Sequence, residues 1–230
     1  MDWYKHSKTG SIAWHEGNKK IEGYTNLGAS YTENLGGGVS MTYTQQDLTS
    51  ITFTTLSNSD WETQAYIDAN GKERWDSCKN TCDKMLAKVK GKSTRSGEII
   101  LTTGDKNGVV NGTTGKLSDG TKSINSSIDN GMPVIVGVDY KDKQKHNLKK
   151  YGGDGMTDHF ILIMGKTETY KKGLLQGIEY RFFDPRTTKR YQGASKQNTL
   201  SVTKGYLKGS YLAKRYDYAV TSIRKTKKTK

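Results

Sequence analysis

Residues 132–140 read MPVIVGVDY, and this run of apolar and β-branched residues predicts a buried β-strand. Two similar runs follow it: residues 158–165 read DHFILIMG, and residues 178–184 read IEYRFFD and end at Pro185. Turn-rich segments separate the three runs, so we predict that they form an antiparallel meander. A further strand is expected at residues 216–223, paired at the edge of this sheet.

The sequence changes its period upstream of these strands, where it predicts a helix. Two cysteines and three apolar residues recur at the spacing of one helix face: Cys78, Cys82, Met85, Leu86 and Val89. Asp76 and Ser77 precede this run and can cap the helix, and Gly91 is a natural stop. Residues 104–122 are rich in turn dipeptides and predict a long loop, and residues 123–129 predict a second, short helix.

The chain divides into two regions of different composition. Residues 1–60 contain aromatic and alternating stretches between Gly-containing turns, which predict a β-rich N-terminal region of short strands. Residues 61–230 combine the helix with the antiparallel strands, which predicts a domain of the α+β class. This domain ends in a basic tail, residues 224–230, and such a block of like charges is typical of a solvated, unstructured end.

The charge of the chain limits the kinds of partner to expect. Its 230 residues carry a formal net charge of +14, which favours nucleic acid, an anionic membrane surface or bacterial cell wall. No ordered motif of basic and aromatic residues for nucleic acid is present, so we expect no nucleic-acid partner. No apolar run approaches the ~18 residues of a membrane span, and no signal peptide follows Met1. If the protein leaves the cell, we expect a route that needs no cleavable signal.

The predicted helix begins at Cys78, and this position favours a reactive thiol. The first turn of a helix has exposed backbone N–H groups and the positive end of the helix dipole, which stabilise a thiolate over a thiol. The thiolate is the nucleophilic form of cysteine. Cys82 lies one turn further along, on the apolar face, where burial would make it an inert, small hydrophobic residue.

A histidine and an aspartate stand at strand ends, where they can complete a catalytic site with Cys78. His159 begins an apolar strand and follows the Gly-rich residues 152–155, which leave an open approach to the imidazole. Asp184 ends the next predicted strand, so pairing of the two strands would bring it beside His159. A carboxylate there would fix the histidine tautomer. Asp158 should point to the opposite strand face, and we therefore prefer Asp184.

The cysteine count argues against other uses of these thiols. Two cysteines four residues apart on a helix would close a disulfide of poor geometry, so we expect both to be free. Together with scattered histidines they do not supply the four ligands of a zinc site. We expect neither a metal nor a cofactor.

Four segments carry a resemblance to a known family. Residues 78–86 (CKNTCDKML) look like the nucleophile helix of papain-like peptidases of the bacteriocin-processing kind. Residues 131–138 (GMPVIVGV), 157–165 (TDHFILIMG) and 183–185 (FDP) resemble their next strand, their histidine strand and the Asp-Pro that follows it. The resemblance covers roughly residues 75–190. It implies a papain-like α+β fold, in which an N-terminal nucleophile helix packs on an antiparallel sheet, with Cys78, His159 and Asp184 as the catalytic triad.

Two departures from the family pattern concern the groups around the nucleophile. Lys79 and Asn80 stand where the family typically has Gly-Pro. The family also places a glutamine upstream of its cysteine as an oxyanion donor, and the candidates for this role are Gln64 and Asn70.

The N-terminal segments resemble a different group of proteins. Residues 2–4 (DWY), 14–17 (WHEG) and 23–28 (GYTNLG) are similar to the junction upstream of C-terminal toxin domains in bacterial polymorphic and Rhs-type effectors. This resemblance implies a secreted antibacterial effector that acts in the periplasm of a target cell or outside cells. It also implies a cognate immunity protein as a partner.

Three functions remain open at this stage. The first is a cysteine peptidase or amidase, with peptidoglycan stem peptides as the first substrate class, because positive charge suits an anionic wall. The second uses the same triad for another acyl transfer, such as deamidation or transglutamination of a protein, and differs in its products. The third is a non-enzymatic basic binding module, for which binding would depend on salt but not on Cys78.

Overall fold

The computed structural model describes residues 2–15, 20–45, 48–105, 110–140, 156–211 and 216–229. The chain forms two compact units. The first comprises Met1–Phe53 with Thr167–Ile178, and the second comprises Thr54–Lys166 with Glu179–Lys230. The Gly-rich residues 152–155, expected beside His159, lie outside the described residues.

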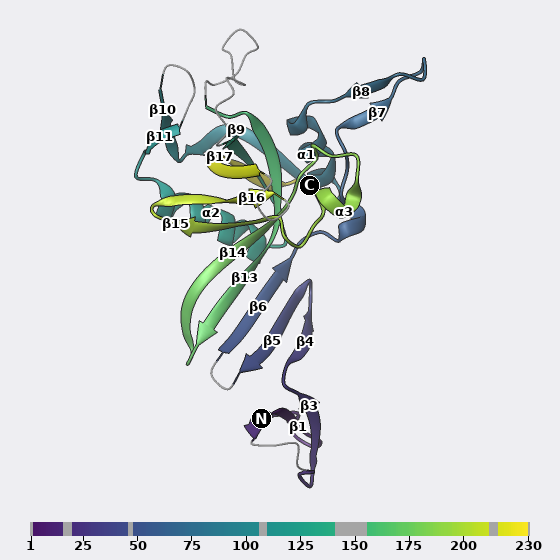
Figure 1. Cartoon of the computed structure of the whole chain (residues 1–230), viewed down its shortest axis with the longest axis vertical. Coiled ribbons are helices and arrows are strands. Elements are labelled where there is room, and N and C mark those ends of the chain that lie inside the picture. The colour runs from purple at the N-terminus through teal and green to yellow at the C-terminus, as the bar shows by residue number, and fades with distance from the viewer. Residues whose placement is uncertain are drawn as a thin grey trace. The chain divides into compact units, whose positions relative to one another are not determined.

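The first unit consists of short antiparallel strands (Figure 1). A three-stranded sheet has the order β2-β1-β3, and β4, β5 and β6 follow as a meander. Trp3 joins these elements, because its ring contacts Trp14 at 4.8 Å and Tyr43 at 5.0 Å between ring centroids. The elements are β1 (Asp2–His6), β2 (Ile12–His15), β3 (Tyr24–Gly28), β4 (Tyr31–Gly36), β5 (Val39–Gln45) and β6 (Leu48–Thr54).

The second unit is built on a closed barrel of six strands. Their order is β12-β17-β16-β15-β14-β13, and pairing of β12 with β13 closes the ring. The strands are β12 (Val134–Tyr140), β13 (His159–Lys171), β14 (Leu174–Phe183), β15 (Thr199–Thr203), β16 (Tyr206–Tyr211) and β17 (Tyr216–Lys228). The end of β13 from Thr167 onward and the beginning of β14 up to Ile178 belong to the first unit. Alternate residues of these strands fill the barrel, and Ile161, Phe182 and Val220 are buried among them.

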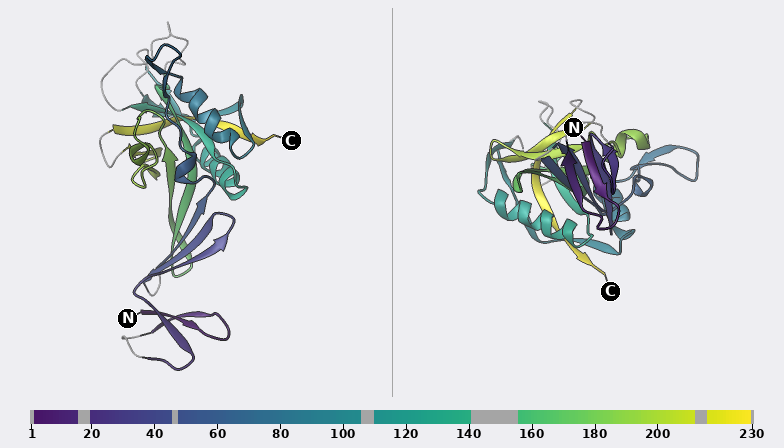
Figure 2. Two further views of the ribbon diagram at one scale, coloured as in Figure 1. Left: turned by 90° about the vertical axis from the view of Figure 1, so that its right-hand side faces the viewer. Right: turned by 90° about the horizontal axis from the view of Figure 1, so that it is seen from below.

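Two longer helices pack on this barrel (Figure 2). The first, α1 (Cys78–Ala87), places Cys82, Met85 and Leu86 against Ile135 and Leu162 on the outer barrel face. The second, α2 (Leu117–Asp129), runs beside β17. The remaining elements are η1 (Asn58–Asp60), β7 (Ala65–Ile67), β8 (Glu73–Trp75), β9 (Gly91–Ile100), β10 (Thr102–Gly104), β11 (Val110–Thr113) and α3 (Arg190–Gly193).

The local predictions for the helix and the three strands are confirmed. Helix α1 begins at Cys78, because the side chain of Ser77 accepts a hydrogen bond from the Asn80 amide. The three buried runs form β12, β13 and β14, and β12 pairs with β13 in antiparallel fashion. These elements carry Cys78 and His159, and Asp184 directly follows the last of them.

The predicted fold class is wrong. The structure is 55% strand and 15% helix and contains a closed six-stranded barrel, so it is not a papain-like α+β fold with a nucleophile helix on an open antiparallel sheet. The cause is the position of the last strand. We expected residues 216–223 at a sheet edge, but β17 lies between β12 and β16 and completes the ring.

The C-terminal basic residues are not an unstructured tail over the part that is described. Residues 225–228 belong to β17 and pair with β9, where Lys227 lies opposite Lys92 and Lys228 opposite Gly91. The Thr229 amide also donates to the Lys90 carbonyl at 2.7 Å. Backbone pairing on this scale outweighs the modest repulsion between neighbouring lysines.

The predicted loop at residues 104–122 is partly helical, because α2 begins at Leu117. Gly120 was a loop signal in the sequence, yet it lies buried inside α2. A Cβ atom at this position would lie 2.7 Å from side-chain atoms of both Ile223 and Leu101. Glycine is therefore present because the helix approaches β17 closely, and this reason cannot be read from local sequence.

Among the described residues, no helix has both the length and the apolar character that crossing a membrane requires.

Candidate active site

Cys78 lies at the first position of α1 and is partly exposed. Its sulfur accepts a hydrogen bond from the Phe160 backbone amide at 3.3 Å. The thiol also forms a hydrogen bond with the His159 side chain. The helix start and the strand start therefore meet at this sulfur atom.

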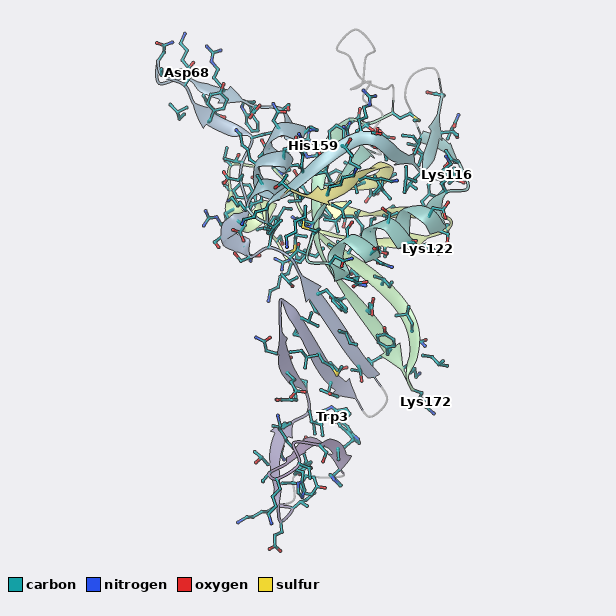
Figure 3. The ribbon with its side chains drawn as sticks, turned by 180° about the vertical axis from the view of Figure 1, so that it is seen from behind. Trp3, Asp68, Lys116, Lys122, His159 and Lys172 are labelled. Carbon is teal, nitrogen blue, oxygen red and sulfur yellow. The ribbon has the colours of Figure 1, made fainter. Side chains whose placement is uncertain are left out.

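His159 is the first residue of β13 (Figure 3). Its side chain is 4% exposed. It lies opposite Val138 of β12, on the strand face that lines the barrel. Its Nε2 atom lies 3.0 Å from Oδ1 of Asp184. Since Nε2 faces the carboxylate, Nδ1 is the ring nitrogen that remains for the Cys78 thiol. The residues that we predicted as nucleophile, base and orienting group thus form one continuous line.

Asp184 follows β14 directly and is fully buried. Its Oδ1 atom also accepts a hydrogen bond from the Arg186 amide at 2.8 Å, and its Oδ2 atom accepts one from the Tyr218 hydroxyl at 2.5 Å. The indole N–H of Trp61 donates to the Asp184 carbonyl at 2.8 Å. The Arg186 amide and the Tyr218 hydroxyl, which donate to the carboxylate oxygens, stabilise its ionised form in the protein interior.

The three groups shift one another's pKa values. Burial raises the pKa of the Cys78 thiol, but hydrogen bonding to His159, its charge and the amides of Phe160 and Lys79 outweigh burial and leave this pKa below its ordinary value. Burial lowers the pKa of His159, but the charge and hydrogen bond of Asp184, with a contribution from Cys78, raise it to about 9. Burial raises the pKa of Asp184, and the His159 charge and hydrogen bonds outweigh it, so this pKa is lowered. These directions favour a thiolate–imidazolium pair near neutral pH.

Cys82 has the opposite environment. It is fully buried on the apolar face of α1, and its thiol donates to the Phe160 carbonyl at 3.5 Å. Burial, followed by the negative charges of Cys78 and Asp184, raises its pKa well above the ordinary value. A thiol that stays protonated is a poor nucleophile, and this supports Cys78 as the reactive cysteine.

Gln64 lies beside both ends of this site, although it is fourteen positions before Cys78 in the sequence. Its backbone amide donates to the Pro185 carbonyl at 3.0 Å, and its backbone carbonyl accepts from the Asp76 backbone amide at 2.7 Å. The β7–β8 hairpin occupies the intervening residues, and Asn70 lies exposed at its turn. Of the two candidate oxyanion donors, Gln64 is therefore the one held next to the triad.

Sequence reasoning missed the groups that surround Asp184. Trp61 and Tyr218 lie 123 and 34 positions away from Asp184 in sequence, so no local spacing connects them. Arg186 contributes its backbone amide, which follows from the turn after Pro185. Within the described residues, no group of three or more His, Cys, Asp or Glu side chains could hold a metal ion.

Comparison of the chain with models of protein families, with curated proteins and with solved structures gives no match.

The two cysteines should differ in reactivity and in its dependence on pH. We expect iodoacetamide to alkylate Cys78 much faster than Cys82 near neutral pH. Because the pKa of Cys78 is lowered, its alkylation should persist below the pH at which an ordinary thiol loses reactivity, and should decline only when acid protonates the thiolate. Mapping the adducts by mass spectrometry across pH measures both effects. Preferential labelling of Cys82 would reverse the assignment.

Proposed function

We propose that this protein is a cysteine hydrolase that cleaves amide bonds with Cys78, His159 and Asp184. The observation that carries the proposal is the unbroken line from the thiol through the imidazole to the buried carboxylate. The pKa shifts are in the directions that nucleophilic catalysis requires. The pKa of the thiol is lowered, the pKa of the imidazole is raised and the pKa of the carboxyl group is lowered.

The proposed reaction has two halves. The Cys78 thiolate attacks the amide carbonyl carbon, and the His159 imidazolium gives its proton to the departing amine as the C–N bond breaks. This leaves an acyl thioester on Cys78 and a neutral imidazole. The imidazole then removes a proton from water, whose oxygen attacks the thioester, releases a carboxylic acid and restores the thiolate–imidazolium pair. The net change is hydrolysis of one amide into an amine and an acid.

Two groups are candidates to stabilise the oxyanion of the intermediates. As the first residue of α1, Cys78 has a backbone N–H without a partner inside the helix. Gln64 is the second candidate, since its backbone is fixed between Pro185 and Asp76. Donors of this kind act on the charge that develops during attack.

The charge of the chain supports peptidoglycan stem peptides as substrate. The net charge is +14, and three exposed lysines share one face of the β9–β17 pair in the unit that holds the triad. Lys92 and Lys227 lie directly opposite each other, and Lys225 is two positions along. Like charges in this arrangement destabilise a sheet, so an anionic partner would relieve them. Among the described side chains, no carboxylate forms an ion pair with these three lysines.

A peptidoglycan substrate also fits the proposed role of a secreted antibacterial effector, because this polymer lies outside the cytoplasm. The acyl-transfer and binding-module functions share the basic surface, but the arrangement of Cys78, His159 and Asp184 favours amide hydrolysis over a role limited to binding.

Incubation with purified peptidoglycan tests the proposed function. We expect mass analysis to show new stem-peptide fragments that have gained one water, and we expect the Cys78→Ala protein to release none. Added salt should slow the reaction, because screening weakens attraction between the lysines and the anionic wall. Fragments that have gained no water but carry a new acyl acceptor would instead indicate the acyl-transfer function.

A further inference from the structure

We infer that Tyr218 is a positioning residue for the triad, and that its hydroxyl holds the Asp184 carboxylate in the orientation that His159 requires. This inference rests on the proposed function, since it assigns a role within the same site. It adds a residue from the strand that closes the barrel, which lies 34 positions after Asp184 in sequence.

The two oxygens of the Asp184 carboxylate contact two different side chains. Oδ1 of Asp184 lies 3.0 Å from His159 Nε2, and Oδ2 accepts the Tyr218 hydroxyl at 2.5 Å. A carboxylate can rotate about its terminal bond, and a donor on each oxygen removes this freedom. Tyr218 on Oδ2, together with the Arg186 amide on Oδ1, therefore fixes which oxygen faces the histidine.

A further observation is the rigidity of Tyr218 itself. The residue is 1% exposed. Its ring stacks on the Tyr211 ring with 6.4 Å between ring centroids, and its centroid lies 5.8 Å from that of the Phe182 ring. Its strand is paired on both sides, because Tyr218 lies opposite Tyr140 of β12 and Gly209 of β16. A hydroxyl on such a side chain has little freedom to leave its acceptor.

The titratable side chains in contact with this carboxylate come from two strands. They are His159 of β13 and Tyr218 of β17, and Cys78 of α1 lies beyond the histidine. The tyrosine hydroxyl helps to keep Asp184 ionised, because a hydrogen bond to a carboxylate favours its charged form. Asp184 in turn stabilises the charged imidazolium of His159, and this imidazolium stabilises the thiolate of Cys78.

The barrel offers a matched control for removal of one hydroxyl. Tyr180 is also 1% exposed, and its hydroxyl donates to Asn125 Oδ1 at 2.9 Å, away from the triad. Tyr180→Phe and Tyr218→Phe thus remove the same atom from equally buried rings. A loss of stability common to both variants is structural, and a functional loss confined to Tyr218→Phe is not.

We expect Tyr218→Phe to lower kcat by roughly tenfold to a hundredfold, the range for loss of a hydrogen bond to a charged group, and to leave KM unchanged. The apparent pKa of Cys78, measured from the pH profile of its alkylation, should rise, because a misplaced Asp184 stabilises the imidazolium less. Tyr180→Phe should change neither quantity. In an Asp184→Ala background, Tyr218→Phe should cost nothing further, since both changes remove the same arrangement.

The outcomes separate this inference from the proposed function. If Cys78→Ala abolishes turnover but Tyr218→Phe matches Tyr180→Phe in kcat and in the Cys78 profile, the role of Tyr218 is overturned and the proposed function stands. A full additional loss from Tyr218→Phe in the Asp184→Ala background would also overturn it. If Cys78→Ala retains turnover, the proposed function itself fails.

Discussion

Cys78→Ala and His159→Ala should each reduce turnover by more than about 10³-fold, while the barrel remains folded. In the proposed reaction, the first change removes the atom that attacks the carbonyl carbon. The second removes the acid that protonates the departing amine and also the cation that keeps Cys78 ionised. Single-turnover assays on peptidoglycan fragments, together with circular dichroism spectra, measure the loss and check the fold.

The other members of the site should respond in a graded way. Asp184→Ala should leave more activity than either of these changes, because the carboxylate orients the imidazole and forms no bond to the substrate. The double variant Cys78→Ala with His159→Ala should be little worse than either single variant, since members of one catalytic unit are not additive. Normal turnover by His159→Ala would contradict the assignment.

Cys82→Ala is the matched control for the nucleophile. It removes the second thiol from the same helix, four positions away, without touching the triad. We expect activity to be retained and the free energy of unfolding to fall by about 1 kcal/mol, because a buried side chain is shortened against Met85 and Leu162.

Local sequence patterns were sufficient to place each residue of the predicted triad on its helix or strand end, whereas the approach of Cys78 to the histidine strand spans 82 positions and was expected from the family resemblance. Ser77 capping, the position of Cys78 at the helix start and the strands around His159 and Asp184 are all short-range features. Once β12 and β13 pair in register and β14 follows β13, the strand ends meet without further information. The geometry of the site could therefore be anticipated even though the fold class was wrong.

Barrel closure could not be anticipated, because it depends on pairing between distant strands. The alternation of apolar and polar residues along a strand indicates which residues share a face, but it does not indicate which strand pairs with it. One usable signal was missed: Lys204 and Gly205 both have positive φ angles, of 50° and 79°, in the tight turn between β15 and β16. Lys172 and Gly173 form the same kind of turn between β13 and β14. A two-residue Lys-Gly turn thus marks a hairpin in both places.

Two contacts of Asp184 join segments that lie far apart in the sequence. Tyr218 reaches the carboxylate only because β17 returns between β12 and β16. Trp61 reaches the Asp184 carbonyl across Gly193, where a Cβ atom would lie 2.2 Å from the indole nitrogen. The sequence contained these residues, but no local pattern connects them, because they lie 34 and 123 positions from Asp184.

Gly209→Ala should have the largest effect on stability, because it acts on the closure of the barrel. Gly209 lies in β16, opposite Leu200 of β15 and opposite Tyr218 of β17. A Cβ atom at this position would lie 1.9 Å from the Thr199 carbonyl oxygen and 2.8 Å from the Leu200 Cα atom. These are backbone atoms of the paired strand, so they cannot move aside as a flexible side chain can. The two strands must separate to admit a methyl group.

Overpacking usually costs about 1–3 kcal/mol, and we expect Gly209→Ala to cost about 3 kcal/mol because backbone must move. This corresponds to an unfolding temperature lower by about 6–12 °C for a domain of this size. Gly177→Ala in β14 is the control, since nothing lies within 4 Å of its added Cβ. Calorimetry of both variants measures the difference, and equal unfolding temperatures would count against this account. Because Gly209 pairs with Tyr218, its replacement should also move the hydroxyl away from Asp184, so turnover should fall in the protein that remains folded.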